Sequence, residues 1–307
     1  MQVHRHWQGL PEAARGASVA MGNFDGLHLG HQAVIAEARG HAPLGVVTFE
    51  PHPREFFRPD APPFRLMNAE ARANRLAKLG VDHLYELPFD ATLAGLTPDA
   101  FVEQVLVNGL GVAHVVVGSD FCFGKGRKGT VATLKSLATR HGFGITVAEM
   151  VRHGPDEISS TAIRAALAEG RPRDAAAMLG HWHRIDGEVI HGEKRGRELG
   201  YPTANMSVAG LHLPKLGVYA TRVDVLTGPQ AGSYLGASSL GVRPMFGENA
   251  PNLETFLLDF KGDLYGQHLS VALVDYLRPE MKFDGLPALL VQMAADVEQA
   301  RRILSAP

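Results

Sequence analysis

The chain has 307 residues and a formal net charge of −2, from 30 basic and 32 acidic residues. This balance argues against an extended nucleic-acid-binding surface, which carries a strong basic excess, and the single cysteine, Cys122, excludes an internal disulfide and a thiolate zinc cluster. No stretch approaches the roughly 18 apolar residues that span a bilayer, and residues 1–16 lack the apolar core of a signal peptide. We therefore expect a two-domain cytoplasmic protein without a nucleic-acid, membrane or obligate protein partner.

The first half of the chain alternates short apolar runs with helical patterns. Strands are expected at residues 19–21, 44–49, 83–87, 114–117 and 145–150, and helices at 32–39, 69–79, 98–106 and 131–140. Continuous apolar strands that alternate with helices are typical of a parallel sheet covered on both faces. The pattern predicts a doubly wound α/β domain whose ligands bind at the carboxyl ends of the strands.

A glycine-rich turn joins the first of these strands to its helix. Residues 21–31 read Met-Gly-Asn-Phe-Asp-Gly-Leu-His-Leu-Gly-His. Such a strand–turn–helix directs backbone N–H groups and the helix dipole at a phosphate. His28 and His31, three apart, present two imidazoles on one side of the helix start, and we expect them to donate to phosphate oxygens in a transition state. The alternative, a tight turn with two solvated histidines, is less consistent with the three flanking glycines, Gly22, Gly26 and Gly30.

A basic, glycine-hinged loop, residues 117–129, follows a later strand. Lys125, Arg127 and Lys128 give it charge for a triphosphate or pyrophosphate. It is not a Walker A loop, because five residues separate Gly118 from Gly124 and Gly126 stands where that loop has Ser or Thr. On charge alone the loop is equally consistent with a solvated surface segment.

The sequence Ile-Ser-Ser-Thr-x-Ile-Arg at 158–164 places three hydroxyls before a helical pattern. Capping the helix needs only one of them. Together with Arg164, the hydroxyls of Ser159, Ser160 and Thr161 suit a phosphate held by O–H and N–H groups and one guanidinium. Short helices are expected at 161–168 and 173–179.

Near residue 182 the pattern changes from strands alternating with helices to strand-like segments separated by turns, so we expect one domain at 1–180 and another at 181–307. Segments 187–191, 217–225, 253–260 and 269–276 alternate or run apolar between Gly, Pro and Asn turns. This spacing predicts a small antiparallel β-barrel. A helix at about 286–304 ends the chain.

A second glycine-rich segment, residues 192–205, lies near the start of this barrel. Its glycines and Lys194 suggest a flexible, charged flap, with glycines at Gly192, Gly196 and Gly200. Thr203 and Asn205 offer oxygen atoms to a Mg²⁺ ion and a nucleotide phosphate. Alternatively, their side chains satisfy the backbone of a turn.

These motifs, in this order, resemble the bacterial bifunctional riboflavin kinase/FAD synthetases over nearly the whole chain. The 22–31 and 158–164 motifs are similar to the Gly-Asn-Phe-Asp-Gly-x-His-x-Gly-His and Ile-Ser-Ser-Thr-x-Ile-Arg elements of nucleotidylyltransferases. Residues 196–205 resemble the riboflavin kinase signature Gly-Arg-x-Leu-Gly-x-Pro-Thr-Ala-Asn. The resemblance implies that a Rossmann-like nucleotidylyltransferase domain precedes a riboflavin kinase-like barrel.

The implied chemistry is phosphorylation of riboflavin to FMN and adenylyl transfer to FMN, giving FAD and pyrophosphate, with ATP as donor and Mg²⁺ assisting. The resemblance implies that His28 and His31 act on the transition-state phosphates and that Ser160, Thr161 and Arg164 hold pyrophosphate. It assigns a further set to the nucleotide and flavin pocket: Asn23, Phe24, Asp25 and Asp120.

In the second domain the resemblance makes Glu254 the base that accepts the proton of the riboflavin 5′-hydroxyl. Two interpretations are open for Arg278: a flavin contact, or an ion pair with Glu280 or Asp284. For Glu254, the alternative without the kinase motif is a solvent-exposed glutamate on the face of a strand.

Three residues depart from the family pattern. Cys122 stands where the family usually has Arg, Met245 where it has Thr, and Phe256 where many members have His. A second hypothesis is therefore an active adenylyltransferase whose barrel binds flavin or regulates. The intact His28 and His31 argue against a protein that only carries flavin. The attached kinase-like domain argues against a nucleotidylyltransferase that acts on another substrate.

Overall fold

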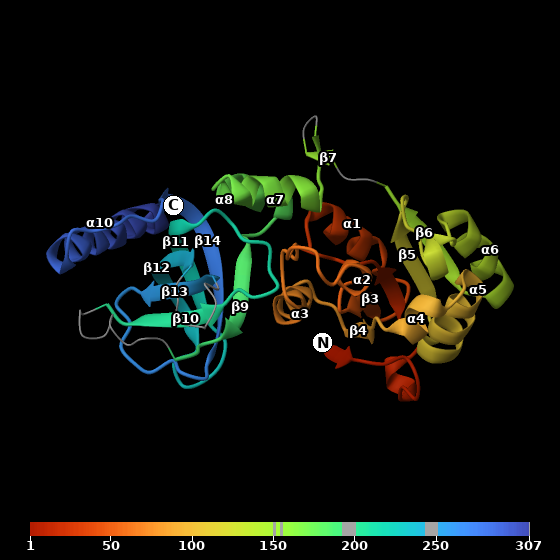
Figure 1. Ribbon diagram of the computed structural model, residues 1–307. Helices are drawn as coiled ribbons and strands as arrows, with labels where there is room; N and C mark the ends of the chain where they lie inside the picture. The colour runs from red at the N-terminus through yellow and green to blue at the C-terminus, as the bar shows by residue number, and fades with distance from the viewer. Residues whose placement is uncertain (150–151, 154–155, 192–200, 243–250, 307) are drawn as a thin grey trace. The chain divides into compact units, whose positions relative to one another are not determined.

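The computed structural model describes residues 1–149, 152–153, 156–191, 201–242 and 251–306 (Figure 1). Packing divides the chain into two compact units, Met1–Pro62 with Arg72–Ile158, and Pro63–Ala71 with Ser159–Pro307. The expected limit between two catalytic domains at 180/181 stays a prediction, because packing units and catalytic domains are different divisions of a chain.

The first unit is built on a parallel six-stranded sheet with the order β1-β4-β3-β2-β5-β6. Its strands are β1 (Gln2–His4), β2 (Ser18–Met21), β3 (Leu44–Glu50), β4 (His83–Pro88), β5 (His114–Gly118) and β6 (Gly144–Ala148). All of β2 and most of β3 are buried, as a sheet covered on both faces requires. A two-stranded ribbon, β7 (Arg152–His153) with β8 (Asp156–Glu157), follows.

Helices connect the strands of this sheet. They are α1 (Leu29–Glu37), α2 (Pro53–Phe57), α3 (Ala69–Lys78), α4 (Ala91–Gly95), α5 (Pro98–Phe101), which continues as a π-helical segment (Val102–Leu110), and α6 (Val131–His141). Thr97 and Thr130 cap α5 and α6, because their side-chain oxygens accept from the backbone N–H groups of Ala100 and Thr133.

The strand order fixes where a ligand site opens in this unit. From β2 the chain proceeds outward to β3 and β4, and then returns to add β5 and β6 on the other side. The carboxyl ends of β2 and β5 therefore flank a topological switch point, where open α/β sheets bind ligands. The turn that follows Met21 lies at this edge.

The second unit begins with two helices and a segment from earlier in the chain. These helices are α7 (Ser160–Ala168) and α8 (Pro172–Leu179). Buried apolar side chains of both helices pack with Leu66. The backbones of Arg65 and Leu211 form an isolated parallel β-bridge.

Six antiparallel strands form a nearly closed barrel in the order β10-β13-β12-β11-β14-β9. They are β9 (Arg184–Glu188), β10 (Thr203–Ser207), β11 (Gly217–Val225), β12 (Gly232–Val242), β13 (Pro251–Leu257) and β14 (His268–Arg278). The edges meet where the Ile190 N–H donates to the Asn205 carbonyl at 2.9 Å. The last helix, α10 (Leu286–Ser305), lies against the barrel (Figure 1). Its residues Ala300 and Leu304 pack against Ala237 and Val274 of the barrel.

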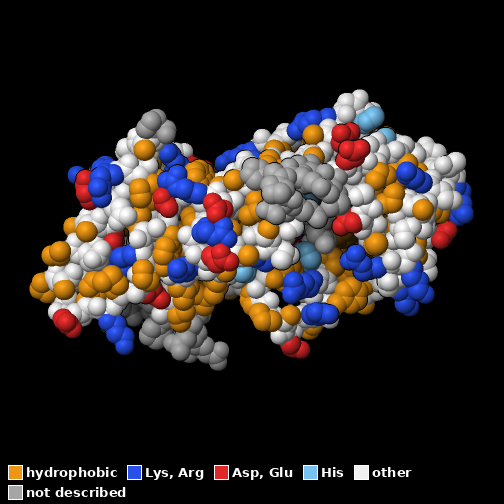
Figure 2. Space-filling model, turned by 90° about the horizontal axis from the view of Figure 1, so that it is seen from above, with side chains coloured by type: hydrophobic (Ala, Val, Ile, Leu, Met, Phe, Trp, Pro, Cys, Tyr) orange, Lys and Arg blue, Asp and Glu red, His pale blue; other side chains and the backbone are white. Residues whose placement is uncertain are grey.

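The expected fold class is confirmed in both halves. Strands that the sequence pattern did not predict are β1, β7, β8, β10 and β12. Strand β12 carries Gly, Ser and Ala positions that weaken its apolar signal. The first barrel strand begins at Arg184 rather than 187. On the face drawn in Figure 2, acidic and basic side chains are interspersed, in keeping with the formal net charge of −2.

A buried histidine makes the stability of the second unit depend on pH. Burial, followed by the nearby His181 and His212, lowers the pKa of His183 to about 3 from 6.5. Because the folded pKa is depressed, stability is fully present above about pH 6.5 and is lost as the pH falls toward 3. Between pH 6.5 and 5, we expect the wild type to lose about 2 kcal/mol more unfolding free energy than His183→Gln.

This is measured by urea unfolding in a Trp7→Phe background, in which Trp182 fluorescence reports on the second unit. Parallel pH dependences of the wild type and the variant would contradict the prediction.

Candidate active sites

The turn after β2 is held in an unusual backbone conformation by burial. Phe24 and Leu27 have positive φ values of 52° and 47°, yet are only 1% and 0% exposed. Non-glycine residues adopt this region at a cost, which the packing of both side chains offsets. Gly26, at φ 87°, needs no such compensation. Thr48 Oγ1 further anchors the turn by donating to the Asn23 carbonyl at 3.1 Å.

His28 and His31 are brought together at the start of α1. His28 is the N-cap residue, and its Nδ1 accepts from the His31 backbone N–H at 3.3 Å. The two rings stack with centroids 3.6 Å apart, and the edge of Phe24 meets His31 at 5.4 Å. An added Cβ at Gly30 would lie 3.1 Å from the His28 ring, so glycine leaves room for this ring position.

The protonation of the pair follows from its surroundings. Burial of the ring, and then the charge of His28, lower the pKa of His31 well below 6.5, so His31 is neutral near pH 7. Because His28 Nδ1 accepts a hydrogen bond, the proton of the neutral ring resides on Nε2, which becomes a donor. Among the described residues, His31 Nδ1 is buried without a hydrogen-bond partner. A phosphate ligand would satisfy such an atom.

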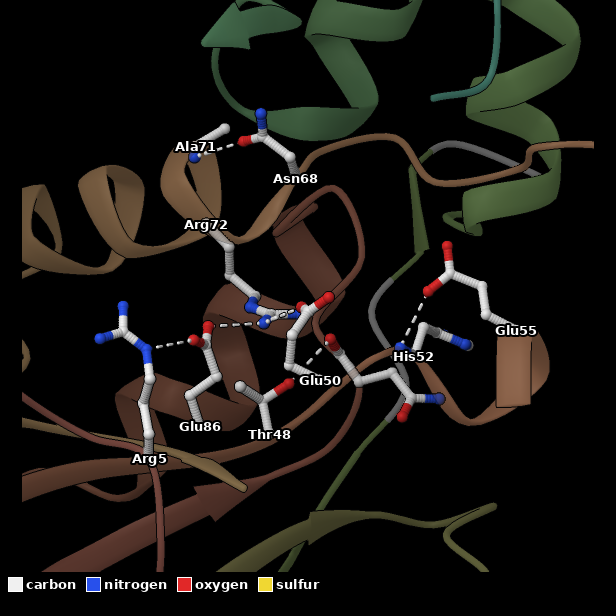
Figure 3. Close-up of polar contacts among 10 residues, drawn as sticks. Arg5, Thr48, Glu50, His52, Glu55, Asn68, Ala71, Arg72 and Glu86 are labelled. Atoms are coloured by element: carbon white, nitrogen blue, oxygen red, sulfur yellow. Dashed lines mark hydrogen bonds and ion pairs between the residues drawn. The ribbon is translucent and has the colours of Figure 1, made fainter. Parts of the chain in front are cut away.

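A buried ion network, which the sequence analysis missed, braces the same edge of the sheet. One Arg72 Nη2 lies 2.8 Å from both Glu50 Oε2 and Glu86 Oε2, and Arg5 Nε lies 3.4 Å from Glu86 (Figure 3). Arg72 is 1% exposed. Glu50 ends β3 and Glu86 belongs to β4, so the guanidinium joins the carboxyl ends of two strands. The sequence did not indicate that Arg72 is buried, because it stands in a largely polar helical segment.

The next residues continue the bracing. His52 caps α2, where its Nδ1 accepts from the Arg54 N–H at 3.0 Å. Its own N–H donates to Glu55 Oε2 at 3.0 Å (Figure 3). This capping box fixes the segment that follows β3. His52 therefore has a structural partner in addition to any contact with a ligand.

The basic loop is closed at its base. Phe123 and Gly129 exchange backbone hydrogen bonds of 3.0 and 2.9 Å, and Phe123 is buried against Phe101. Asp120 and the three basic residues of the loop are exposed, namely Lys125, Arg127 and Lys128. The loop thus presents its charges on a rigid base.

The hydroxyl motif begins α7 in the second unit. Ser159 is the N-cap, and its Oγ accepts from the Ala162 N–H at 3.2 Å, while Ser160 and Thr161 form the first turn. Arg164 Nε donates to the Phe64 carbonyl at 2.6 Å, and its guanidinium carbon lies 5.4 Å from the Phe64 ring centroid. The helix N-terminus supplies the N–H groups expected of an anion site.

A polar group lies on the outer face of the barrel. Thr203 and Asn205 belong to strand β10 rather than to a turn, and Asn205 is paired directly with Glu254 of β13. Asn252 Nδ2 donates to Asn205 Oδ1 at 3.2 Å and to Glu254 Oε1 at 3.4 Å. Strand alternation places Asn252 on the face of Glu254, a signal the sequence analysis did not use.

Arg278 forms its ion pair with α10. Its guanidinium contacts both carboxylate oxygens of Asp296, at distances of 2.6–3.1 Å, and Asp296 is 5% exposed. The ion pair is thus with Asp296 instead of Glu280 or Asp284, and it joins β14 to α10. A contact between Arg278 and flavin stays a prediction.

Several predicted residues fall outside the described residues. They are Gly192, Lys194, Gly196, Gly200 and Met245. Within the described ranges, no three His, Cys, Asp or Glu residues group as a metal site, and no helix is long and apolar enough to cross a membrane.

Comparison with known proteins shows relatives over the full length of the chain. A family model described as FAD synthetase matches residues 10–162, and one described as riboflavin kinase matches residues 179–304. The bifunctional riboflavin kinase/FMN adenylyltransferase of Pseudomonas fluorescens is 41% identical, with 100% of this chain and 99% of the relative covered. The protein of the same name from Escherichia coli K12 is 38% identical, with 98% and 97% covered.

A solved structure described as a macrolide-efflux protein from Streptococcus pneumoniae is also similar. Its TM-score is 0.79 at 30% identity, with 98% of each chain covered. That description belongs to the other protein, and the likeness adds a shared fold over nearly the full length.

The buried network yields a stability prediction for the first unit. Arg72→Met should lower its unfolding free energy by about 3–5 kcal/mol, because two carboxylates lose their buried partner. Urea unfolding in a Trp182→Phe background, followed by the fluorescence of buried Trp7, measures the change.

The matched control is Arg140→Met, which removes an exposed ion pair with Asp99 whose side chains are 62% and 64% exposed. It should cost less than about 1 kcal/mol. Equal losses in the two variants would show that the Arg72 network does not support the fold.

Proposed function

The chain belongs to the family of bifunctional riboflavin kinase/FMN adenylyltransferases, and from this premise we propose which residues carry out its two reactions. It phosphorylates riboflavin to FMN with ATP, and it transfers an adenylyl group from ATP to FMN, which gives FAD and pyrophosphate. The assignment of residues rests above all on the Asn205–Glu254 pair across β10 and β13. The stacked rings of His28 and His31 at the start of α1 support the assignment of the adenylyltransferase residues.

In the adenylyl transfer, a phosphate oxygen of FMN attacks the α-phosphorus of ATP and pyrophosphate leaves. This chemistry requires positioning and charge stabilisation rather than a covalent nucleophile. We assign His28 and His31 to the phosphate oxygens that gain charge. The neutral imidazole of His31 suits this role, because its lowered pKa lets it donate an N–H group without taking up a proton at neutral pH.

The remaining adenylyltransferase residues are assigned by their motifs. Ser160, Thr161 and Arg164 hold the departing pyrophosphate, and Ser159 orients their turn as the α7 cap. The pocket for nucleotide and flavin is assigned to the turn after β2 and to the basic loop, through Gly22, Asn23, Phe24, Asp25, Gly26, Gly30 and Asp120. The buried conformation of the turn supports a pre-organised pocket wall.

In the kinase reaction, Glu254 accepts the proton of the riboflavin 5′-hydroxyl as its oxygen attacks the γ-phosphorus, and ADP leaves. Thr203 and Asn205 would supply oxygen ligands to Mg²⁺, and Gly192, Lys194, Gly196 and Gly200 are assigned to nucleotide binding by their motif. The donor set fits Mg²⁺, which takes oxygen ligands and is usually held by one or two side chains with substrate phosphates. When bound, Mg²⁺ neutralises phosphate charge.

We further propose that the enzyme is cytoplasmic and that its partners are the small molecules riboflavin, FMN and ATP. The flavin contact of Arg278 belongs to the same proposal. Its pairing with Asp296 would hold the guanidinium in one orientation beside α10.

The first test separates the two activities from the adenylyltransferase side. His31→Ala should slow FAD formation from FMN by about 10²–10³-fold, because it removes a donor to the transition-state phosphates. Riboflavin should still be converted to FMN, which accumulates. Product analysis by chromatography, with riboflavin or FMN as substrate, measures both.

The matched control is His41→Ala, because His41 also stacks on a histidine, His114, at 4.1 Å. It should leave both activities intact. Unchanged FAD formation by His31→Ala would refute the role of His31.

The second test addresses the kinase side. Glu254→Gln keeps the size of the side chain but loses its basicity, and should slow riboflavin phosphorylation by about 10²–10⁴-fold. FMN adenylylation should remain at the wild-type rate. Glu188→Gln, on barrel strand β9, is the control carboxylate. Loss of both activities in a folded Glu254→Gln protein would contradict the assignment of two separate sites.

A further inference from the structure

Asn252 is a buried polar residue to which neither reaction has so far assigned a role. It lies on β13, is 2% exposed and precedes the proposed base Glu254 by two residues. Burying an amide is costly unless its hydrogen bonds are made inside the protein. The partners of this amide therefore indicate what it does.

The Asn252 amide joins the two principal groups of the proposed kinase site. Its single Nδ2 lies 3.2 Å from Asn205 Oδ1 and 3.4 Å from Glu254 Oε1. Asn205 Nδ2 in turn faces the Thr203 carbonyl at 3.4 Å. These contacts give Asn205 one orientation, with Oδ1 toward the Asn252 amide nitrogen and Nδ2 toward the Thr203 carbonyl.

Strand geometry explains how the three side chains meet. Asn205 and Glu254 are direct partners across β10 and β13, while their neighbours Met206 and Leu253 pair inside the barrel core. Because side chains alternate along a strand, Asn205, Asn252 and Glu254 share the outer face.

We propose that Asn252 is a positioning residue of the riboflavin kinase site, which holds the amide oxygen of Asn205 and the carboxylate of Glu254 side by side. A primary amide suits the role because one nitrogen carries two N–H donors. Leucine at this position has no donor and serine has one. This inference rests on the roles proposed above for Asn205 and Glu254.

The test compares Asn252→Leu with Asn252→Ser in the full-length enzyme. Asn252→Leu should lower the kcat of riboflavin phosphorylation about 10–100-fold and raise the Mg²⁺ concentration needed for half-maximal rate, as loss of a partner behind a ligand does. Asn252→Ser should lose less. The KM for riboflavin should stay within about 2-fold, because Asn252 is not proposed to bind it.

The matched control is Thr255→Val on the same strand. Thr255 is 0% exposed and its hydroxyl meets Ser238 at 2.9 Å, so this change also removes a buried hydrogen bond. It should lower stability but leave the kinase kcat and its Mg²⁺ dependence unchanged. FMN adenylylation and the Trp182 unfolding transition establish that each variant is folded.

A double variant tests whether Asn252 acts through Asn205. If it does, Asn205→Ala combined with Asn252→Leu should lose little more activity than Asn205→Ala alone, since coupled residues are not additive. Independent, multiplicative losses would overturn the proposal.

The outcomes also separate this inference from the proposed function. A folded Asn252→Leu enzyme with wild-type kinase kcat and Mg²⁺ dependence overturns the role of Asn252, while an inactive Glu254→Gln still supports the site. An active Glu254→Gln instead refutes the proposed site itself. Should Asn252→Leu not fold, Asn252→Ser carries the same comparison, and its wild-type kinetics would overturn the proposal.

Discussion

The backbone hydrogen bonds that pair neighbouring strands are the interaction on which both proposed sites depend. In the first unit, parallel pairing of β2 with β3 and β5 opens the turn after Met21 at the edge where strand order reverses. In the second, the antiparallel register of β10 and β13 sets Asn205 opposite Glu254. A slip of one residue would turn Asn205 into the core and expose Met206.

The two sites reach their geometry by different means. His28 and His31 are three residues apart, so one helix start is sufficient to stack them, and the capping bond also selects the tautomer of His28. Asn205 and Glu254 are 49 positions apart in number and meet only because two strands pair. In both sites a local hydrogen bond orients a group before any substrate arrives, which is what transfer of a phosphoryl or adenylyl group requires.

Buried charge performs a supporting role around the first site. Arg72 gathers Glu50 and Glu86 at the carboxyl ends of β3 and β4, next to the edge at which the turn after β2 opens. Such a cluster contributes little net stability compared with an apolar core, yet losing one partner is costly. Its physical effect is therefore to fix how the two strand ends are placed. In the second unit, Asp296 of α10 pairs with Arg278 and fixes the placement of α10 against β14.

The sequence by itself determined the fold class of both halves and the local geometry of the His28–His31 turn, because apolar periodicity, glycine placement and caps act over a few residues. Thr203 and Asn205 were found by their motif, but their strand β10 was not predicted and emerged only from its pairing with β13. Tertiary structure alone decided the partners of Arg72 and Arg278 and the contact of Asn252 with Asn205. Those contacts join residues from separate elements, and no pattern within one segment encodes which distant carboxylate or amide packing will bring alongside.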